Sequence, residues 1–137
     1  MIRKIQHVGV AVNSLKEAVP FFRDVLGLEH LGTEELPERR IRAALFRVGE
    51  SRIELIEPTA PDGPVGRFLE KNGEGIHHIC FQVDDAAAAL SRVGSHGVRL
   101  IDETPRAGIR GLRIGFLDPR STFGVLTEFA QEGEREP

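Results

Sequence analysis

The chain has 137 residues, of which 40% are hydrophobic and 28% charged, and its formal net charge at pH 7 is -3. This length suits one domain, or two small halves that share a core. The slightly negative charge excludes the bulk basic field that attracts nucleic acid or a membrane surface, and no apolar run reaches transmembrane length. One cysteine excludes an intramolecular disulfide, and the start does not read as a signal peptide, so we expect a cytoplasmic protein.

The first half of the sequence predicts a strand, a helix and three further strands. Residues 5–12 alternate, with Val8, Val10 and Val12 on the face opposite His7. Ser14-Leu15-Lys16-Glu17 fits a capping box, and apolar residues then recur at helical spacing until Gly27. Strand-like segments follow near residues 28–34, 41–48 and 52–57, with the last turn at Glu50-Ser51.

The second half of the sequence predicts the same order of elements. A connector rich in proline and glycine comes first and contains a short helical stretch near residues 66–71. A strand at 76–83 precedes a helix at 86–93, which Asp84 or Asp85 caps. Three more strands are expected near residues 98–103, 112–118 and 123–129.

The two halves keep a nearly constant offset, which indicates an internal repeat. His7 and His78 are 71 residues apart, Gly27 and Gly97 are 70 apart, Phe46 and Phe116 are 70 apart, and Glu54 and Glu128 are 74 apart. We therefore predict a single α+β domain over residues 1–137, built from two tandem βαβββ modules. The modules cover residues 3–58 and 75–130, separated by a connector at 59–74 and followed by a frayed tail at 131–137.

The repeat brings one histidine and one glutamate per half to matching strand positions: His7, Glu54, His78 and Glu128. A carboxylate in the middle of an apolar strand is costly to bury unless it is paired or bound to a metal. Taken singly, a strand histidine is more often a hydrogen-bonded structural residue, and a glutamate near a strand end is more often solvated. The symmetry of all four favours a shared cation, and two imidazoles with two carboxylates suit Co, Ni, Mn, Fe or Zn. His77 falls on the helix side and is the weaker candidate.

Other candidate residues carry weaker signals. Arg120 and Ser121, in a loop before the Glu128 strand, are candidate contacts for a substrate carboxylate or phosphate, although a plain turn after Pro119 explains them equally well. Three arginines make a second edge locally basic, namely Arg106, Arg110 and Arg113. Cys80 lies in an apolar strand pattern and is expected to be a small core residue.

At these residues the chain resembles the vicinal oxygen chelate superfamily (the glyoxalase, bleomycin resistance and dioxygenase proteins), and most closely its methylmalonyl-CoA epimerase family. The resemblance covers residues 4–130. The strands around His7 and Glu128 are common to the superfamily. The stretches that point to the epimerases are Phe68-Leu69-Glu70-Lys71-Asn72-Gly73-Glu74-Gly75-Ile76-His77-His78-Ile79 and Phe116-Leu117-Asp118-Pro119-Arg120-Ser121-Thr122.

The resemblance implies paired βαβββ modules that form a curved mixed sheet around a metal-binding cleft. It implies interconversion of (R)- and (S)-methylmalonyl-CoA by metal-assisted proton transfer at C2 through an enolate, with an acyl-CoA substrate and a homodimer. His7, His78 and Glu128 carry over as metal ligands, and Glu54 matches a position that is Gln or Glu in relatives. Cobalt is the ion that the family often prefers, with Mn, Ni or Zn as alternatives. Some epimerases carry a second glutamate base where this chain has Ala43.

On this interpretation Glu128 and Glu54 are the candidate catalytic carboxylates, one on each side of the ion. Two alternatives stay open. One is a glyoxalase I-type lactoylglutathione lyase, which also uses a two-His, two-Glu site. The other is a non-catalytic ligand-binding member of the superfamily, although such proteins tend to lack the ligand set and to line the cleft with aromatic residues.

Overall fold

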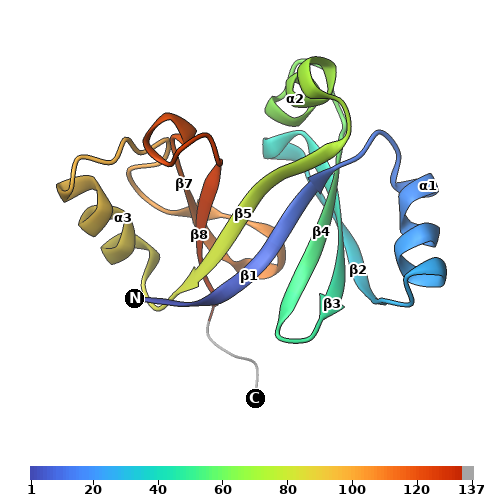
Figure 1. Ribbon diagram of the computed structural model, residues 1–137, viewed down its shortest axis with the longest axis horizontal. Helices are drawn as coiled ribbons and strands as arrows, with labels where there is room; N and C mark the ends of the chain where they lie inside the picture. Colours follow the sequence, from blue (N-terminus) through green and yellow to red (C-terminus); the bar gives the residue numbers. More distant parts are fainter. Residues whose placement is uncertain (134–137) are drawn as a thin grey trace. The chain divides into compact units, whose positions relative to one another are not determined.

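A computed structural model describes residues 1–133 of the chain, which divide into two compact units (Figure 1). One unit is residues 7–77; the other combines residues 1–6 with the chain from His78 onward. We call them the 7–77 unit and the His78 unit. Residues 134–137 of the expected frayed tail lie outside the described residues, and the expected module boundaries stay a prediction. Within residues 1–133, no helix is both long enough and apolar enough to span a membrane.

The 7–77 unit contains the order of elements expected for the first module. β1 (Ile2–Ala11) enters it at His7 and pairs in parallel with β4, and β4 and β3, then β3 and β2, pair antiparallel. The remaining elements are α1 (Leu15–Pro20), the π-helical turn η1 (Phe21–Val25), β2 (Glu29–Leu36), the 3-10 turn η2 (Pro37–Arg39), β3 (Ile41–Val48), β4 (Ser51–Pro58) and α2 (Pro64–Asn72).

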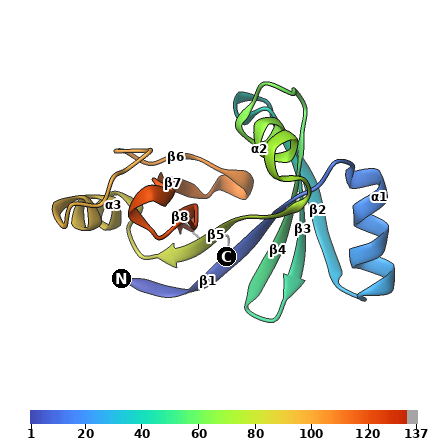
Figure 2. The same ribbon diagram turned by 45° about the horizontal axis from the view of Figure 1, so that its top comes forward.

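The helix of this unit begins and ends where the sequence predicts. The Ser14 side chain accepts a hydrogen bond from the Glu17 N–H, as the capping box requires, and Gly27 stops the helical stretch at a positive φ of 75°. α1 lies beside the strands of its own unit (Figures 1 and 2), where Val12, Phe46 and Leu55 form the buried core with it. The face of β1 that carries the valines is therefore the helix face.

The His78 unit repeats this pattern with shorter strands. β5 (Gly75–Val83) pairs in parallel with β8, while β8 and β7, then β7 and β6, pair antiparallel. Asp85 caps the helix by accepting from the Ala88 N–H, whereas Asp84 forms an ion pair with Arg3. The other elements are α3 (Ala86–Ser95), β6 (Arg106–Ala107), the 3-10 turns η3 (Ile109–Gly111) and η4 (Pro119–Ser121), β7 (Arg113–Leu117) and β8 (Thr127–Gln131).

The expected fold class is confirmed. Each unit runs through strand, helix and three strands, and the mixture of parallel and antiparallel pairs makes a mixed sheet. β1 and β5 are each divided between the two units, and the strands take the order β2-β3-β4-β1 in one half of the chain and β5-β8-β7-β6 in the other. Such an order, with α1 and α3 as the repeated helices, is that of an α+β protein with a duplicated βαβββ unit.

The prediction of a strand near residues 98–103 is wrong. Only Leu100 forms a bridge there, with Leu117, and the first strand after α3 is instead the two-residue β6. The cause is a side chain, because the Asp102 carboxylate accepts the Phe116 N–H at 2.8 Å and so occupies a donor that a regular strand would use.

Two further boundaries differ from expectation. β8 starts at Thr127 rather than near 123, because Phe123 and Gly124 both have positive φ and continue the turn that follows Pro119. The turn before β4 is Gly49-Glu50, and Ser51 already belongs to the strand.

Candidate functional site

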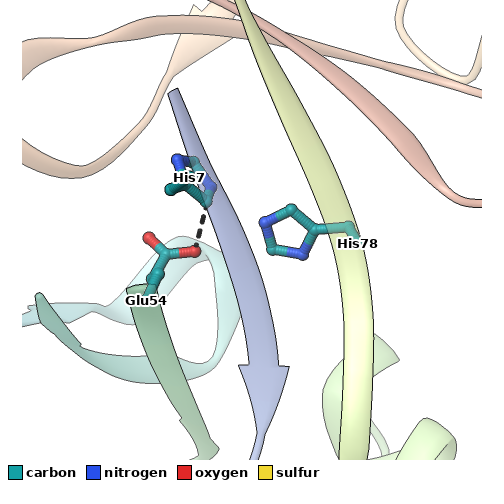
Figure 3. A group of neighbouring side chains, drawn as sticks. All are labelled: His7, Glu54 and His78. Carbon is teal, nitrogen blue, oxygen red and sulfur yellow. Dashed lines mark ion pairs between the residues drawn. The ribbon is translucent and has the colours of Figure 1, made fainter. Parts of the chain in front are cut away.

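The 7–77 unit carries a buried His–Glu pair. His7 lies on β1 and Glu54 on β4, and the parallel register puts Gly9 opposite Glu54, so His7 and Glu54 share one sheet face. Their side chains meet with His7 Nε2 3.4 Å from Glu54 Oε1 (dashed in Figure 3, which also labels His78). Both residues are at most 2% exposed. A carboxylate buried this deeply requires a positive or hydrogen-bonding partner, which the imidazole supplies.

The His78 unit carries an equivalent pair. His78 lies on β5 and Glu128 on β8, with His78 Nε2 3.1 Å from Glu128 Oε1. These two residues are also at most 2% exposed. In this unit Cys80 is the register partner of Glu128, as Gly9 is of Glu54 in the other. The residue two positions after each histidine therefore faces the glutamate in both units.

The structure corrects one equivalence drawn from the sequence. Phe46 pairs with Ile53 and packs into the helix-side core, whereas Phe116 pairs with Glu128 and lies on the site face. The counterpart of Phe116 is therefore Leu45, which pairs with Glu54. The two units do repeat the same elements, but the offset that matches β3 to β7 is 71 residues, from Leu45 to Phe116, and not the 70 residues that separate the two phenylalanines.

The side-chain types of the two pairs suit a divalent ion. Each pair offers an imidazole nitrogen and a carboxylate oxygen, and His7, Glu54, His78 and Glu128 all belong to groups of buried residues that could hold a metal ion. Cys80 is the remaining member of these groups. It is fully buried, as expected for a core residue. Two carboxylates would balance the charge of a divalent ion, so the donor set fits the expected metal.

His77 has different surroundings from its neighbour. Its ring packs edge-on against Phe68 of α2, with ring centroids 4.9 Å apart, whereas His78 is buried beside Glu128. The alternation of β5 turns the two adjacent rings to opposite faces of the strand. The sequence-based preference for His78 over His77 agrees with this geometry.

Ala43, the residue that departs from some epimerases, lies on the same sheet face as Glu54. Its register partner in β4 is Ile56, two residues beyond Glu54, and in β2 it is Glu34. Ala43 is fully buried. A carboxylate at position 43 would thus have shared a face with the His7–Glu54 pair, and this chain has a methyl group there.

Arg120 and Ser121, the predicted substrate contacts, both have partners inside the protein. The Arg120 guanidinium pairs with Asp118 at 2.7 Å, and this contact holds the pKa of the Asp118 carboxyl at about 2. The Ser121 hydroxyl accepts the Arg99 N–H at 2.9 Å. Both contacts belong to the turn η4, as expected if these residues build a plain turn.

A second group of residues surrounds the His78–Glu128 pair, and little in the sequence indicates it. Phe116 packs edge-on against His78, with ring centroids 5.7 Å apart, and the Arg106 guanidinium carbon lies 5.6 Å from the centre of the same ring. Asp102 pairs with Arg106 Nε at 3.1 Å. From the sequence, Arg106 was only one of three arginines on a basic edge, because nothing in the local pattern places it over Phe116.

Comparison with known proteins identifies the family. The model of the Glyoxalase/Bleomycin resistance protein/Dioxygenase superfamily matches residues 6–116. The chain is 42% identical to the uncharacterized protein YqjC of Bacillus subtilis over 95% of this chain and 93% of that protein. It is 35% identical to the ethylmalonyl-CoA/methylmalonyl-CoA epimerase of Cereibacter sphaeroides, covering 96% and 99% of the two chains.

Comparison with solved structures supports the same family. A variant of Streptomyces coelicolor methylmalonyl-CoA epimerase in complex with 2-nitronate-propionyl-CoA is 38% identical, with a TM-score of 0.95 over 100% of this chain and 99% of that one. The chain belongs to the methylmalonyl-CoA epimerase family of this superfamily. The resemblance drawn from the sequence is therefore confirmed at the level of the family, and its fold is the one that the two units display.

Proposed function

We propose that this protein interconverts (R)- and (S)-methylmalonyl-CoA by removing and returning the proton at C2. The observation that carries the proposal is that each unit of this epimerase-family chain holds one buried His–Glu pair. Relatives named as epimerases cover nearly the whole chain, and one is solved with an acyl-CoA analogue. Buried carboxylates and histidines are among the groups that can transfer a proton to or from carbon.

We further propose that the two pairs together hold one divalent ion, with His7, Glu54, His78 and Glu128 as its ligands. The nitrogen and oxygen donors suit Co, Mn, Ni or Zn, and no thiolate is required. Among these ions we propose Co first only because the family resemblance implies it. A bound ion would supply Lewis-acid polarisation of the thioester carbonyl, which stabilises negative charge developed next to C2.

In this proposal the chain itself handles the proton. Glu54 and Glu128 come from different units and act as the two proton-transfer groups, one removing the C2 proton and the other returning it from the opposite side. Each carboxylate has two oxygens, so one oxygen can face a cation while the other exchanges a proton. His7 and His78 fix the orientation of the two carboxylates. Because position 43 is alanine, Glu54 carries this role in the 7–77 unit.

Deuterium exchange at C2 tests the two-carboxylate mechanism. With each epimer in heavy water, Glu54→Gln and Glu128→Gln should each lower C2 exchange by about a hundredfold or more, as expected for loss of a general acid or base. The two variants should differ in which epimer is affected more. Full exchange in both variants would show that the assignment is wrong.

The stoichiometry of metal binding tests the shared centre. One ion per chain should be lost in either His7→Ala or His78→Ala, because both pairs would contribute to one site. Two ions per chain, each sensitive to only one of these substitutions, would contradict a shared centre without contradicting epimerase activity.

Assays on other substrates test the two alternatives. Lactoylglutathione formation without exchange of methylmalonyl-CoA would favour the glyoxalase I-type lyase. Binding of ligand with neither activity, and no rise in thermal stability on adding Co or Mn, would favour the non-catalytic binder.

Three further expectations from the sequence are part of the proposal. Arg120 and Ser121 would contact the acyl-CoA, which requires Arg120 to exchange its Asp118 contact for the ligand. The protein would be a cytoplasmic homodimer. Sedimentation at several protein concentrations tests the dimer, and the binding of CoA thioesters to Arg120→Gln tests the contact.

A further inference from the structure

Arg106 lies on the sheet face that carries Glu128. In the antiparallel pair β6–β7 its register partner is Ile114, two residues before Phe116, and Phe116 is the register partner of Glu128. Paired residues, and residues two apart in one strand, share a face. Arg106 is therefore an arginine of the outer strand β6 that projects on the same side as the buried His78–Glu128 pair.

The Arg106 guanidinium is held over the site by two contacts. Its carbon lies 5.6 Å from the centre of the Phe116 ring, and that ring packs against the His78 imidazole, so only one aromatic ring separates the cation from the pair. On the other side, Arg106 Nε pairs with Asp102 Oδ1 at 3.1 Å, while Asp102 Oδ2 accepts the Phe116 N–H. Asp102 thus positions both the ring and the guanidinium above it.

This arrangement leaves Arg106 able to meet a ligand. Its side chain is 45% exposed although it is anchored at Nε. A guanidinium has five N–H donors in a planar fork that matches a carboxylate, and a cation held over an aromatic face is pre-organised for an anion. An anion bound to the Arg106 guanidinium must therefore lie close to the Glu128 carboxylate.

We propose that Arg106 binds the free carboxylate of the malonyl-type acyl group, an inference that rests on the proposed function. A methylmalonyl group carries its carboxylate on the same carbon that loses the proton. Only the Phe116 ring separates the Arg106 guanidinium from His78, so the guanidinium can bind this carboxylate while C2 lies near the His78–Glu128 pair. The CoA phosphates lie at the far end of the pantetheine arm and are the less suitable anion. Arg106 would thereby select acyl groups that carry a carboxylate over those that do not.

The test compares ligands with and without the carboxylate. Equilibrium binding of methylmalonyl-CoA, propionyl-CoA and methylmalonyl-pantetheine is measured with the metal-loaded protein and Arg106→Gln. We expect methylmalonyl-CoA and methylmalonyl-pantetheine to bind the variant about tenfold or more weakly, the loss typical of a charge-assisted hydrogen bond. Propionyl-CoA should change by no more than about twofold, because it lacks the carboxylate.

Two variants complete the test. Arg113→Gln is the matched control, because Arg113 lies in the same strand pair but pairs with Ala107 and so faces the opposite side. It should leave all three affinities unchanged. Arg106→Lys keeps the charge but not the fork, and it should restore part of the preference for the carboxylate.

The outcomes separate this inference from the proposed function. Equal losses for propionyl-CoA and methylmalonyl-CoA, or a loss confined to ligands with the nucleotide phosphates, would overturn the role of Arg106. Epimerase activity would then still stand. A wild-type protein that binds none of the three ligands would overturn both.

Discussion

The Nε2 atom of His78 lies 3.1 Å from the Oε1 atom of Glu128, and both side chains are almost completely buried. His77, the preceding residue, packs instead against Phe68. The two histidines therefore form a natural pair of variant and control, since they are adjacent residues of the same type with different surroundings.

We predict that His78→Ala lowers the affinity for Co²⁺ or Mn²⁺ by at least about tenfold, because even partners outside the ligand shell cost about 10–100-fold when removed. It should also destabilise the fold, since Glu128 loses its buried partner. His77→Ala should keep the metal affinity and lose only the packing against Phe68. Metal titration with calorimetry measures both variants, and equal affinities would exclude His78 as a ligand.

Removing the metal should lower stability by mass action. An ion present at about 100 times its Kd stabilises the folded state by about 2.7 kcal/mol, so a chelator should lower the unfolding temperature and added Co²⁺ should restore it. His7→Ala is the control, in which the ion should have a much smaller effect. An unfolding temperature that does not respond to ions in the wild type would contradict the metal centre.

Much of the site could be predicted from the sequence, because alternation in β1 and β5 fixes which side chains share a face. The rule that separates His78 from His77 is the strand period of two, and the near-constant offset pairs each histidine with a glutamate. Helix ends were also predictable, since Ser14 and Gly27 have local signatures. These signals depend on a few neighbouring residues only.

The parts that could not be predicted depend on contacts between distant residues. Asp102 replaces a backbone partner of Phe116 with its side chain, so the strand expected near residues 98–103 is almost absent. The register of β7 against β8 places Phe116 opposite Glu128. The constant offset in the sequence instead matches Phe116 with Phe46, which lies on the helix side of its own unit. Arg106 gains its position from the pairing of β6 with β7, in which it lies opposite Ile114.

The Glu57 carboxylate joins α1 to the sheet of its unit, and its loss should destabilise the protein. Glu57 Oε1 accepts the Leu15 N–H at 2.6 Å in the first turn of α1, and Oε2 accepts from Arg42 at 3.0 Å. Glu57→Gln should lower the free energy of unfolding by about 1–2 kcal/mol, because it weakens two charge-assisted hydrogen bonds.

Glu35→Gln is the matched control for Glu57→Gln. Glu35 also binds Arg42, but its side chain is 56% exposed, so its loss should cost no more than about 0.5 kcal/mol. Urea unfolding measures the two variants, and equal effects would show that the contact with Leu15 contributes nothing of its own.

The Asp118 carboxyl should make stability depend on pH in acid. Its hydrogen bonds with the Arg120 side chain and N–H hold its pKa at about 2, below the usual 3.8. Because the folded state has the lower pKa, its contribution is present above pH 3.8 and is lost as the pH falls towards about 2. Asp118→Asn should therefore flatten the acid side of the stability profile between these values. A profile identical to that of the wild type would contradict the pairing with Arg120.

Gly66 should be intolerant of even a methyl group. A Cβ at this position would lie 2.6 Å from the Pro61 carbonyl oxygen and 2.7 Å from that of Ala60, both backbone atoms. Alanine is favoured over glycine in a helix by about 1 kcal/mol, but the clash with backbone cannot be relieved by a side-chain rotation. Gly66→Ala should therefore destabilise the protein by about 1–3 kcal/mol. Gly75→Ala, where a Cβ meets no atom within 4 Å, should change stability by no more than about 0.5 kcal/mol. Thermal unfolding of the two variants distinguishes them, and a stabilised Gly66→Ala protein would show that the segment before α2 moves aside readily.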